Sequence, residues 1–125
     1  MSGISRSSVS SLPKTGTIVT TTIGQGETQT ITGAKEGETW KIIGVTLDNQ
    51  FGSAGTMLIS LVDGQGNEVE LSEDLTVGAS SKVPVELGKY SSGEIIVDYN
   101  IKLQATFVSG DADAINAVVG YVKVN

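Results

Sequence analysis

Two amino acids that carry much of protein chemistry are missing from this chain. Its 125 residues include no histidine and no cysteine. The chain therefore cannot build a Ser-His-Asp or Cys-His catalytic set, a histidine general base, or a histidine or cysteine site for zinc or haem. No disulfide can stabilise it, so its stability must come from a hydrophobic core or from assembly. We expect no enzymatic activity and no cofactor.

Long hydrophobic runs and clustered positive charge are also missing. No stretch of about eighteen apolar residues occurs, so we expect no transmembrane helix and no membrane partner. The formal net charge is −6, and the lysines after residue 26 are scattered, which argues against nucleic-acid binding. The first residues, Met1–Arg6, lack the apolar segment of a signal peptide, so we expect synthesis and folding in a cytoplasm.

The clearest positive signal lies in the last third of the chain. From Val97 to Val108, apolar and polar residues alternate strictly. A period of two predicts a β-strand with one buried and one wet face, here roughly 35 Å long at about 3.3 Å per residue. Such a strand needs a second sheet to cover its apolar side. The length of the chain allows one domain, so we expect a β-sandwich.

Other segments repeat this signal between short turns. The predicted strands are Thr17–Ile23, Thr28–Thr32, Trp40–Leu47, Met57–Val62, a short run around Val69–Leu71, Val83–Leu87 and Ile115–Val124. Two positions predict finer detail. The alternation slips near Gly44, which indicates a β-bulge, and Pro84 lacks a backbone donor, which predicts a sheet edge. About eight antiparallel strands predict an all-β jelly-roll or Greek-key sandwich over residues 16–125.

Residues 1–15 differ from the rest in composition. They are rich in serine and include two cations, Arg6 and Lys14, whereas the first acidic residue is Glu27. Six lysines against fourteen acids give residues 27–125 a charge of −8. A segment this polar cannot order on its own, so it is either a flexible tail or, as we expect, an extended arm held by a neighbouring subunit. Its candidate interface residues are Ile4, Arg6, Val9, Leu12 and Lys14.

The remaining polar clusters have ordinary structural explanations. Asp111 and Asp113 lie two apart in a turn, but a calcium site needs six or more oxygens. Glu68 and Glu70 share one strand face and are expected to face solvent rather than to form a glycosidase pair. Trp40, the only tryptophan, is flanked by strand signals and is expected to anchor the core.

Several strand and turn segments resemble those of small β-sandwich virion proteins of tailed viruses, of the head-decoration or minor-capsid type. The segments are Gly37–Val45, Leu61–Asn67, the Ser-rich turn before Val83, and Gly110-Asp111 before the last strand. The likeness covers roughly residues 26–125 and consists of packing and turn positions. It implies a jelly roll that forms oligomers on a capsid exterior, without enzymatic activity.

The sequence thus predicts a non-enzymatic virion protein assembled in a host cytoplasm. Its expected partners are further copies of itself, with a trimer favoured, and a major capsid protein or other virion protein. The alternative is a carbohydrate- or receptor-binding module of a tail, fibre or adhesin, which would use the loops Asp48–Gly55 and Lys89–Gly93. Only four aromatic residues could serve such a module: Trp40, Phe51, Tyr90 and Tyr99.

Overall fold

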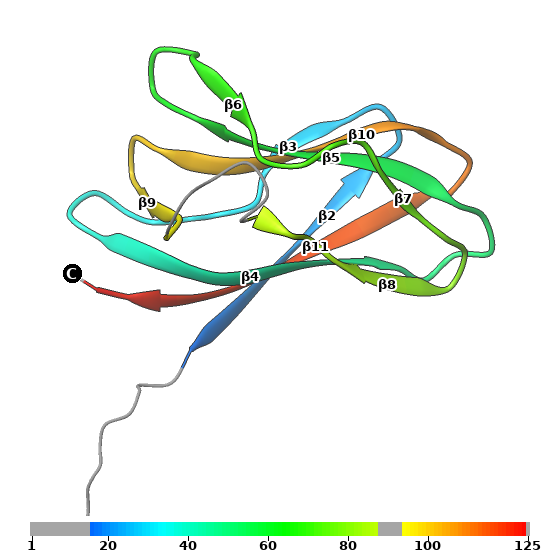
Figure 1. The fold of residues 1–125 in the computed structure, drawn as a ribbon, viewed down its shortest axis with the longest axis horizontal. Coiled ribbons are helices and arrows are strands. Elements are labelled where there is room, and N and C mark those ends of the chain that lie inside the picture. Colours follow the sequence, from blue (N-terminus) through cyan, green and yellow to red (C-terminus); the bar gives the residue numbers. More distant parts are fainter. Residues whose placement is uncertain (1–15, 88–93, 125) are drawn as a thin grey trace, which may run out of the picture.

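The regular structure of this chain is β-strand. The computed structural model describes residues 16–87 and 94–124, and the ribbon shows two layers of strands (Figure 1). The strands in these residues are β2 (Thr17–Gly24), β3 (Thr28–Thr30), β4 (Thr39–Asn49), β5 (Gly55–Val62), β6 (Glu68–Glu70), β7 (Leu75–Val77), β8 (Ser81–Pro84), β9 (Ile96–Asp98), β10 (Lys102–Gly110) and β11 (Ala114–Lys123). This described part contains no helix long and apolar enough to cross a membrane.

The strands form two five-stranded antiparallel sheets, which confirms the predicted all-β sandwich. The first sheet has the order β3-β10-β5, with β6 and β7 both pairing with β5. The second has the order β2-β11-β4, with β8 and β9 both pairing with β4. Two short strands therefore share one place at an edge of each sheet. Ten strands thus fill eight places. The sequence predicted about eight strands because it gave β9 and β10 as one strand and did not predict β7.

The core lies between the sheets and takes one face from each. Along β11 the side chains alternate between buried and half-buried, as a period of two requires. The largest side chains with almost no exposed surface come from both sheets: Phe107, Ile23, Ile31, Leu47, Met57, Ile59, Leu71, Leu103 and Ile115. The core is almost wholly aliphatic, because Phe107, Trp40 and Tyr121 are its only buried aromatic residues within the described segments.

Two detailed predictions are confirmed. The register of β4 against β11 shifts so that Gly120 pairs with Gly44 and Tyr121 with Ile42, which leaves Ile43 as the extra residue. This is the bulge expected near Gly44, displaced by one residue. Pro84 ends β8 at the edge of its sheet, where a missing N–H removes no ladder bond.

The prediction of one long strand from Val97 to Val108 is wrong. The segment forms β9 in one sheet and β10 in the other, and the chain crosses between them at Tyr99–Ile101. The carboxylate of Asp98 causes the corner, because it accepts the backbone N–H groups of Asn100 at 2.8 Å and Ile101 at 2.7 Å. Tyr99 and Ile101, expected to be buried, are therefore 49% and 37% exposed.

Two edge strands, β3 and β6, are each followed by a buried hydroxyl group that accepts a backbone N–H of the neighbouring inner strand. After β3, Ile31 donates its N–H to the carbonyl of Leu103, and the Thr32 hydroxyl accepts the N–H of Leu103 at 3.2 Å. After β6, the N–H of Leu71 donates to the carbonyl of Ile59, whose own N–H donates to the Ser72 hydroxyl at 3.1 Å. Each hydroxyl supplies the acceptor that a longer edge strand would have supplied.

Removing such a hydroxyl leaves a buried N–H without a partner. We expect Thr32→Val, which keeps the side-chain volume, to lower the free energy of unfolding by about 1–3 kcal/mol in urea unfolding. Thr28→Val is the control, because Thr28 is exposed and water can replace the bond between its hydroxyl and that of Thr106. The control should change stability by under about 0.5 kcal/mol. Equal losses in the two variants would contradict this account.

Candidate functional site

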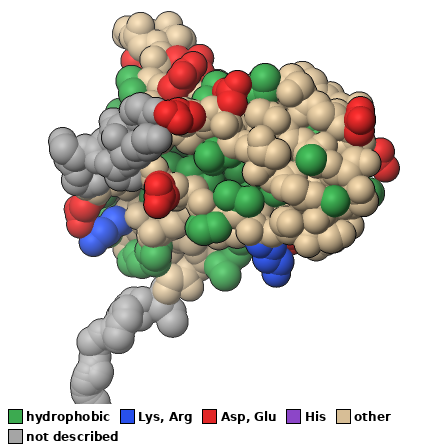
Figure 2. Space-filling view, turned by 45° about the vertical axis from the view of Figure 1, so that its right-hand side comes forward, with side chains coloured by type: hydrophobic (Ala, Val, Ile, Leu, Met, Phe, Trp, Pro, Cys, Tyr) green, Lys and Arg blue, Asp and Glu red, His purple; other side chains and the backbone are tan. Residues whose placement is uncertain are grey.

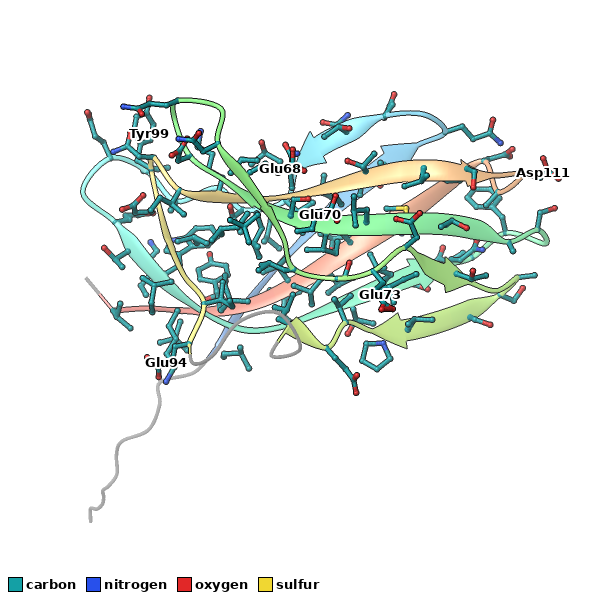
Figure 3. The ribbon with its side chains drawn as sticks, turned by 45° about the horizontal axis from the view of Figure 1, so that its top comes forward. Glu68, Glu70, Glu73, Glu94, Tyr99 and Asp111 are labelled. Carbon is teal, nitrogen blue, oxygen red and sulfur yellow. The ribbon has the colours of Figure 1, made fainter. Side chains whose placement is uncertain are left out.

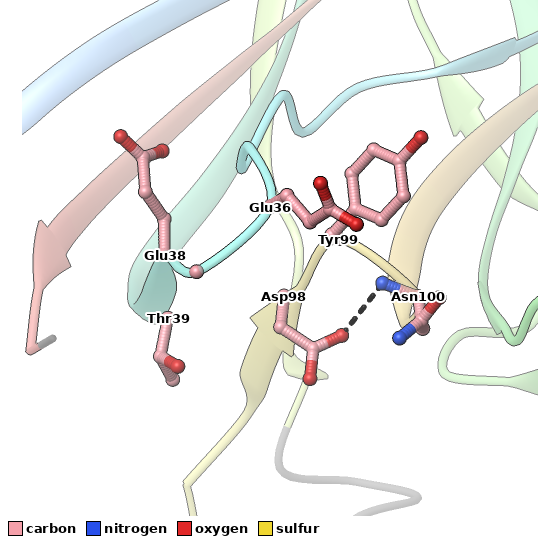
Figure 4. A pocket seen from close by; sticks show the side chains of 7 residues that line it. Glu36, Glu38, Thr39, Asp98, Tyr99 and Asn100 are labelled. Atoms are coloured by element: carbon pink, nitrogen blue, oxygen red, sulfur yellow. Dashed lines mark hydrogen bonds between the residues drawn. The ribbon is translucent and has the colours of Figure 1, made fainter.

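One end of the sandwich carries a polar hollow between two loops (Figure 4). It is lined by residues 36–39, which lead into β4, and by Asp98, Tyr99 and Asn100, which follow β9. Its volume is about 240 Å³, which is below the roughly 300–1,000 Å³ of most ligand pockets. The hollow contains three carboxylates, those of Glu36, Glu38 and Asp98, and its chemistry depends on the groups that these carboxylates already bind.

Glu38 is held by hydrogen bonds within the protein. Its Oε1 accepts the backbone N–H of Lys35 at 3.0 Å and the indole N–H of Trp40 at 3.2 Å, and its Oε2 lies 3.0 Å from the Lys123 ammonium. The Lys35 N–H is the largest cause, followed by Lys123, of a pKa lowered to about 2. Glu38 therefore stays ionised at neutral pH and cannot serve as a general acid there.

Asp98 is also committed to structure. Its carboxylate forms the corner between β9 and β10, and its own N–H donates to the carbonyl of Ile101. Glu38 and Asp98 are thus both used to hold loops in place, and Glu36, the third carboxylate of the hollow, is exposed. The hollow is best explained as a structural feature of the sandwich end.

Trp40 lies in the core, as predicted, at 4% exposure. Its ring stacks on that of Tyr121, with centroids 3.6 Å apart and planes 5° from parallel. The indole N–H is satisfied by Glu38, which suits a buried tryptophan beside a sheet end. A buried, stacked ring cannot form a platform for a sugar. Sequence reasoning missed Tyr121, because only the pairing of β11 with β4 brings the two rings together.

The other acidic candidates do not gather into a metal site. Asp111 and Asp113 are both exposed, as are Glu68 and Glu70 on β6. Within residues 16–87 and 94–124, no group of three or more acidic side chains is placed to hold a metal ion. The N–H of Asp111 donates to the carbonyl of Ala54, so this turn is fixed against the loop after β4.

The aromatic residues proposed for sugar binding lie far apart. Tyr99 follows β9, and the last residue of β9, Asp98, pairs with Thr39 at the start of β4. Phe51 lies two residues beyond the other end of β4. The 11 residues of β4 separate these two ends, and Figure 3 shows Tyr99 and Asp111 at opposite ends of the molecule. The Lys102 ammonium lies 5.2 Å from the centre of the Tyr99 ring. Phe51 and Tyr99 therefore cannot form one stacking surface.

Other predicted site residues lie outside the described part of the chain. They are the arm residues Ile4, Arg6, Val9, Leu12 and Lys14, and Tyr90 in the loop Lys89–Gly93.

An apolar patch that the sequence did not predict lies on the outer face of the β2-β11-β4 sheet. Ile18 is 69% exposed and Ile43 is 63% exposed. Ile18 pairs with Gly120, which pairs with Gly44, and Ile43 is the residue before Gly44. Two glycines without side chains therefore lie between the two isoleucines. A Cβ added at Gly16 would lie 3.0 Å from Ile43 Cδ1, so Ile43 reaches across to the start of β2. We call Ile18 and Ile43 the outer-face patch.

Figure 2 shows one side of the molecule, on which hydrophobic side chains lie near the middle and acidic side chains mostly toward the outline. Exposed branched apolar residues on a sheet face are typical of contacts with other proteins rather than of catalytic sites. The signal in the sequence that could have revealed this patch is the predicted bulge near Gly44. A bulge turns one more residue outward than strict alternation allows, and here that residue is Ile43.

No protein-family model and no curated protein matches this chain.

The lowered pKa of Glu38 makes part of the stability depend on pH. Its pKa is about 2 in the folded protein against an ordinary 4.5, so its contribution is fully present above about pH 4.5 and is lost as the pH falls toward 2. We expect the free energy of unfolding to fall over this range, and to fall less in Glu38→Gln, by urea unfolding at each pH. Glu70→Gln removes the same charge from exposed β6 and should follow the wild type. Parallel curves for wild type and Glu38→Gln would disprove the role of Glu38.

Proposed function

We propose that this chain is a non-enzymatic structural subunit of a virion, of the head-decoration or minor-capsid type. The strand order carries the proposal. In one sheet the four places hold, in order, β2, β11, β4, and the pair β8 and β9. In the other sheet they hold β3, β10, β5, and the pair β6 and β7. A jelly roll has eight antiparallel places in two such sheets, with chain crossings that form two Greek keys. We propose that the sandwich is a jelly roll of this kind.

Two further observations favour a structural role over catalysis. The best-placed carboxylates, Glu38 and Asp98, are engaged by backbone N–H groups. The outer-face patch offers apolar surface to a protein partner. Its proposed partners are other copies of this chain and a capsid protein, and its proposed location is the virion exterior.

The direct test is the composition of particles. Virions of the virus that encodes this chain should contain it in many copies, detected by mass spectrometry of purified particles. Antibodies against the chain should label the outside of the particle in electron microscopy. Absence of the chain from purified, infectious particles would reject the proposal.

The arm carries a prediction of its own within this proposal. Deleting residues 1–15 should leave the sandwich folded, because the strand pattern begins at Thr17, and should weaken attachment to particles. Circular dichroism and thermal unfolding check the fold, and co-sedimentation with particles stripped of the protein checks attachment.

Two full-length variants identify the forces involved. The triple change Ile4→Ser, Val9→Ser and Leu12→Ser removes apolar contacts but keeps both charges. The pair Arg6→Ser and Lys14→Ser removes the charges alone and should weaken attachment mainly at low salt. If the shortened chain sedimented with particles as well as the full chain, the arm would have no role in attachment.

A further inference from the structure

The edges of the two sheets differ in how they are protected. Edge strands expose unpaired N–H and C=O groups, and proteins usually block them with short strands, charged residues or proline. β3, β6, β7 and β9 have 3 residues each, and β8 has 4. β6 carries Glu68 and Glu70, and β8 carries Lys82 and Pro84. These edges are therefore poor templates for another strand.

The edge formed by β2 lacks these protections over Thr17–Ile23. It is 8 residues long, Thr17–Gly24, and contains no charged residue and no proline. It pairs with β11 through eight consecutive residues without a register shift, so it is straight along its length. No strand of the described chain pairs with its other side. The N–H of Gly24 donates to the Glu27 carboxylate at 2.9 Å, and its carbonyl accepts the Glu27 N–H at 3.1 Å. The free backbone groups therefore lie at alternate residues of Thr17–Ile23, over about 23 Å.

The surface beside this edge is also suited to burial. Ile18 belongs to β2 itself, and its outer-face neighbour in the patch is Ile43. The next outward side chain on β2, Thr20, pairs with Val118, which pairs with Thr46. This row contains no charge. Threonine and isoleucine are residues with high strand propensity, so they favour a further strand at this position.

We propose that the outer edge of β2 binds β2 of a second copy of this chain, antiparallel and across a two-fold axis. An antiparallel edge is complementary to itself, so one surface serves both subunits. The two five-stranded sheets would then join into one continuous sheet.

Charge supports a second copy as the occupant. Residues 27–125 carry −8, so two copies repel each other over most of their surface. They can approach with least repulsion where a strand carries no acidic side chain, and Thr17–Ile23 carries none. The nearest described carboxylate along this strand, that of Glu27, lies at its end against Gly24. This inference does not depend on a virion role. It predicts a dimer, whereas the family resemblance predicts a trimer.

The first experiment compares two matched double variants by sedimentation equilibrium of the full chain at 0.15 M salt. The wild type should have about twice the chain mass of 12.9 kDa. Ile18→Lys with Thr20→Lys places like charges opposite each other in the pair and should weaken the dimer at least about tenfold. Val69→Lys with Thr76→Lys makes the same types of change on β6 and β7 and should leave it intact. Circular dichroism and thermal unfolding confirm that each variant is folded.

The second experiment uses the absence of cysteine. Single cysteines introduced at Ile18, Thr20 or Thr22 lie on one face of β2, and opposite residues of an antiparallel pair are close enough for a disulfide. At least one should form a disulfide-linked dimer under mild oxidation much faster than Thr46→Cys, two strands away on the same face.

Three results would overturn the proposal. The first is a monomeric wild type. The second is a dimer that survives the β2 changes but dissociates with the β6 and β7 changes. The third is an oligomer whose β2 cysteines link no faster than Thr46→Cys, which would place another segment, such as residues 1–15 of a neighbour, on this edge. None of these results bears on whether the chain occurs in virions.

Discussion

The structure depends on satisfying the backbone hydrogen bonds where strands leave the sheets. The inner strands β5 and β10 are longer than the edge strands β3, β6 and β7 beside them, so some of their buried N–H groups have no opposite strand. Thr32 and Ser72 solve this problem with hydroxyl groups that accept from Leu103 and Ile59. A buried N–H without a partner costs about as much as a hydrogen bond, and here it would lie in the centre of a sheet. Short edge strands are possible because these side chains complete the ladders.

The same requirement explains why the polar side chains of the ends form no reactive centre. Glu38 and Asp98 accept backbone N–H groups at the turns they support. Asp63 does the same in the hairpin between β5 and β6, where the side chain and backbone of Asn67 are the largest causes of its lowered pKa. These carboxylates stabilise loops by accepting backbone N–H groups. The described residues also leave backbone groups of β2 unpaired with any described strand, and the side chains of Ile18 and Ile43 exposed.

Much of the fold could be predicted, because alternation along a strand is a local property. The runs around β2, β4, β5 and β11 were located within a few residues, and the irregularity near Gly44 and the edge position of Pro84 were both identified. The failure between Val97 and Val108 has a physical cause. A chain that turns a corner between two sheets can keep its alternation, and only the hydrogen bonds of Asp98 end one strand and allow the next. The candidate surface was missed, since an exposed isoleucine on β2 looks like any other alternating apolar residue.

The sequence by itself determined the class of fold and the range of chemistry. Residues of period two fix strands, and a chain without histidine or cysteine lacks the common catalytic and metal-binding side chains. Only the tertiary structure decided which strands became neighbours, because pairing joins residues far apart in the chain. Tyr121 reaches Trp40 through the register of β11 on β4, and the Thr32 hydroxyl reaches the N–H of Leu103, 71 residues later in the sequence. Which edge remains open follows from the same long-range pairing. The strand pattern of Thr17–Ile23 shows a β-strand, but its free side exists because β11 occupies only the other one.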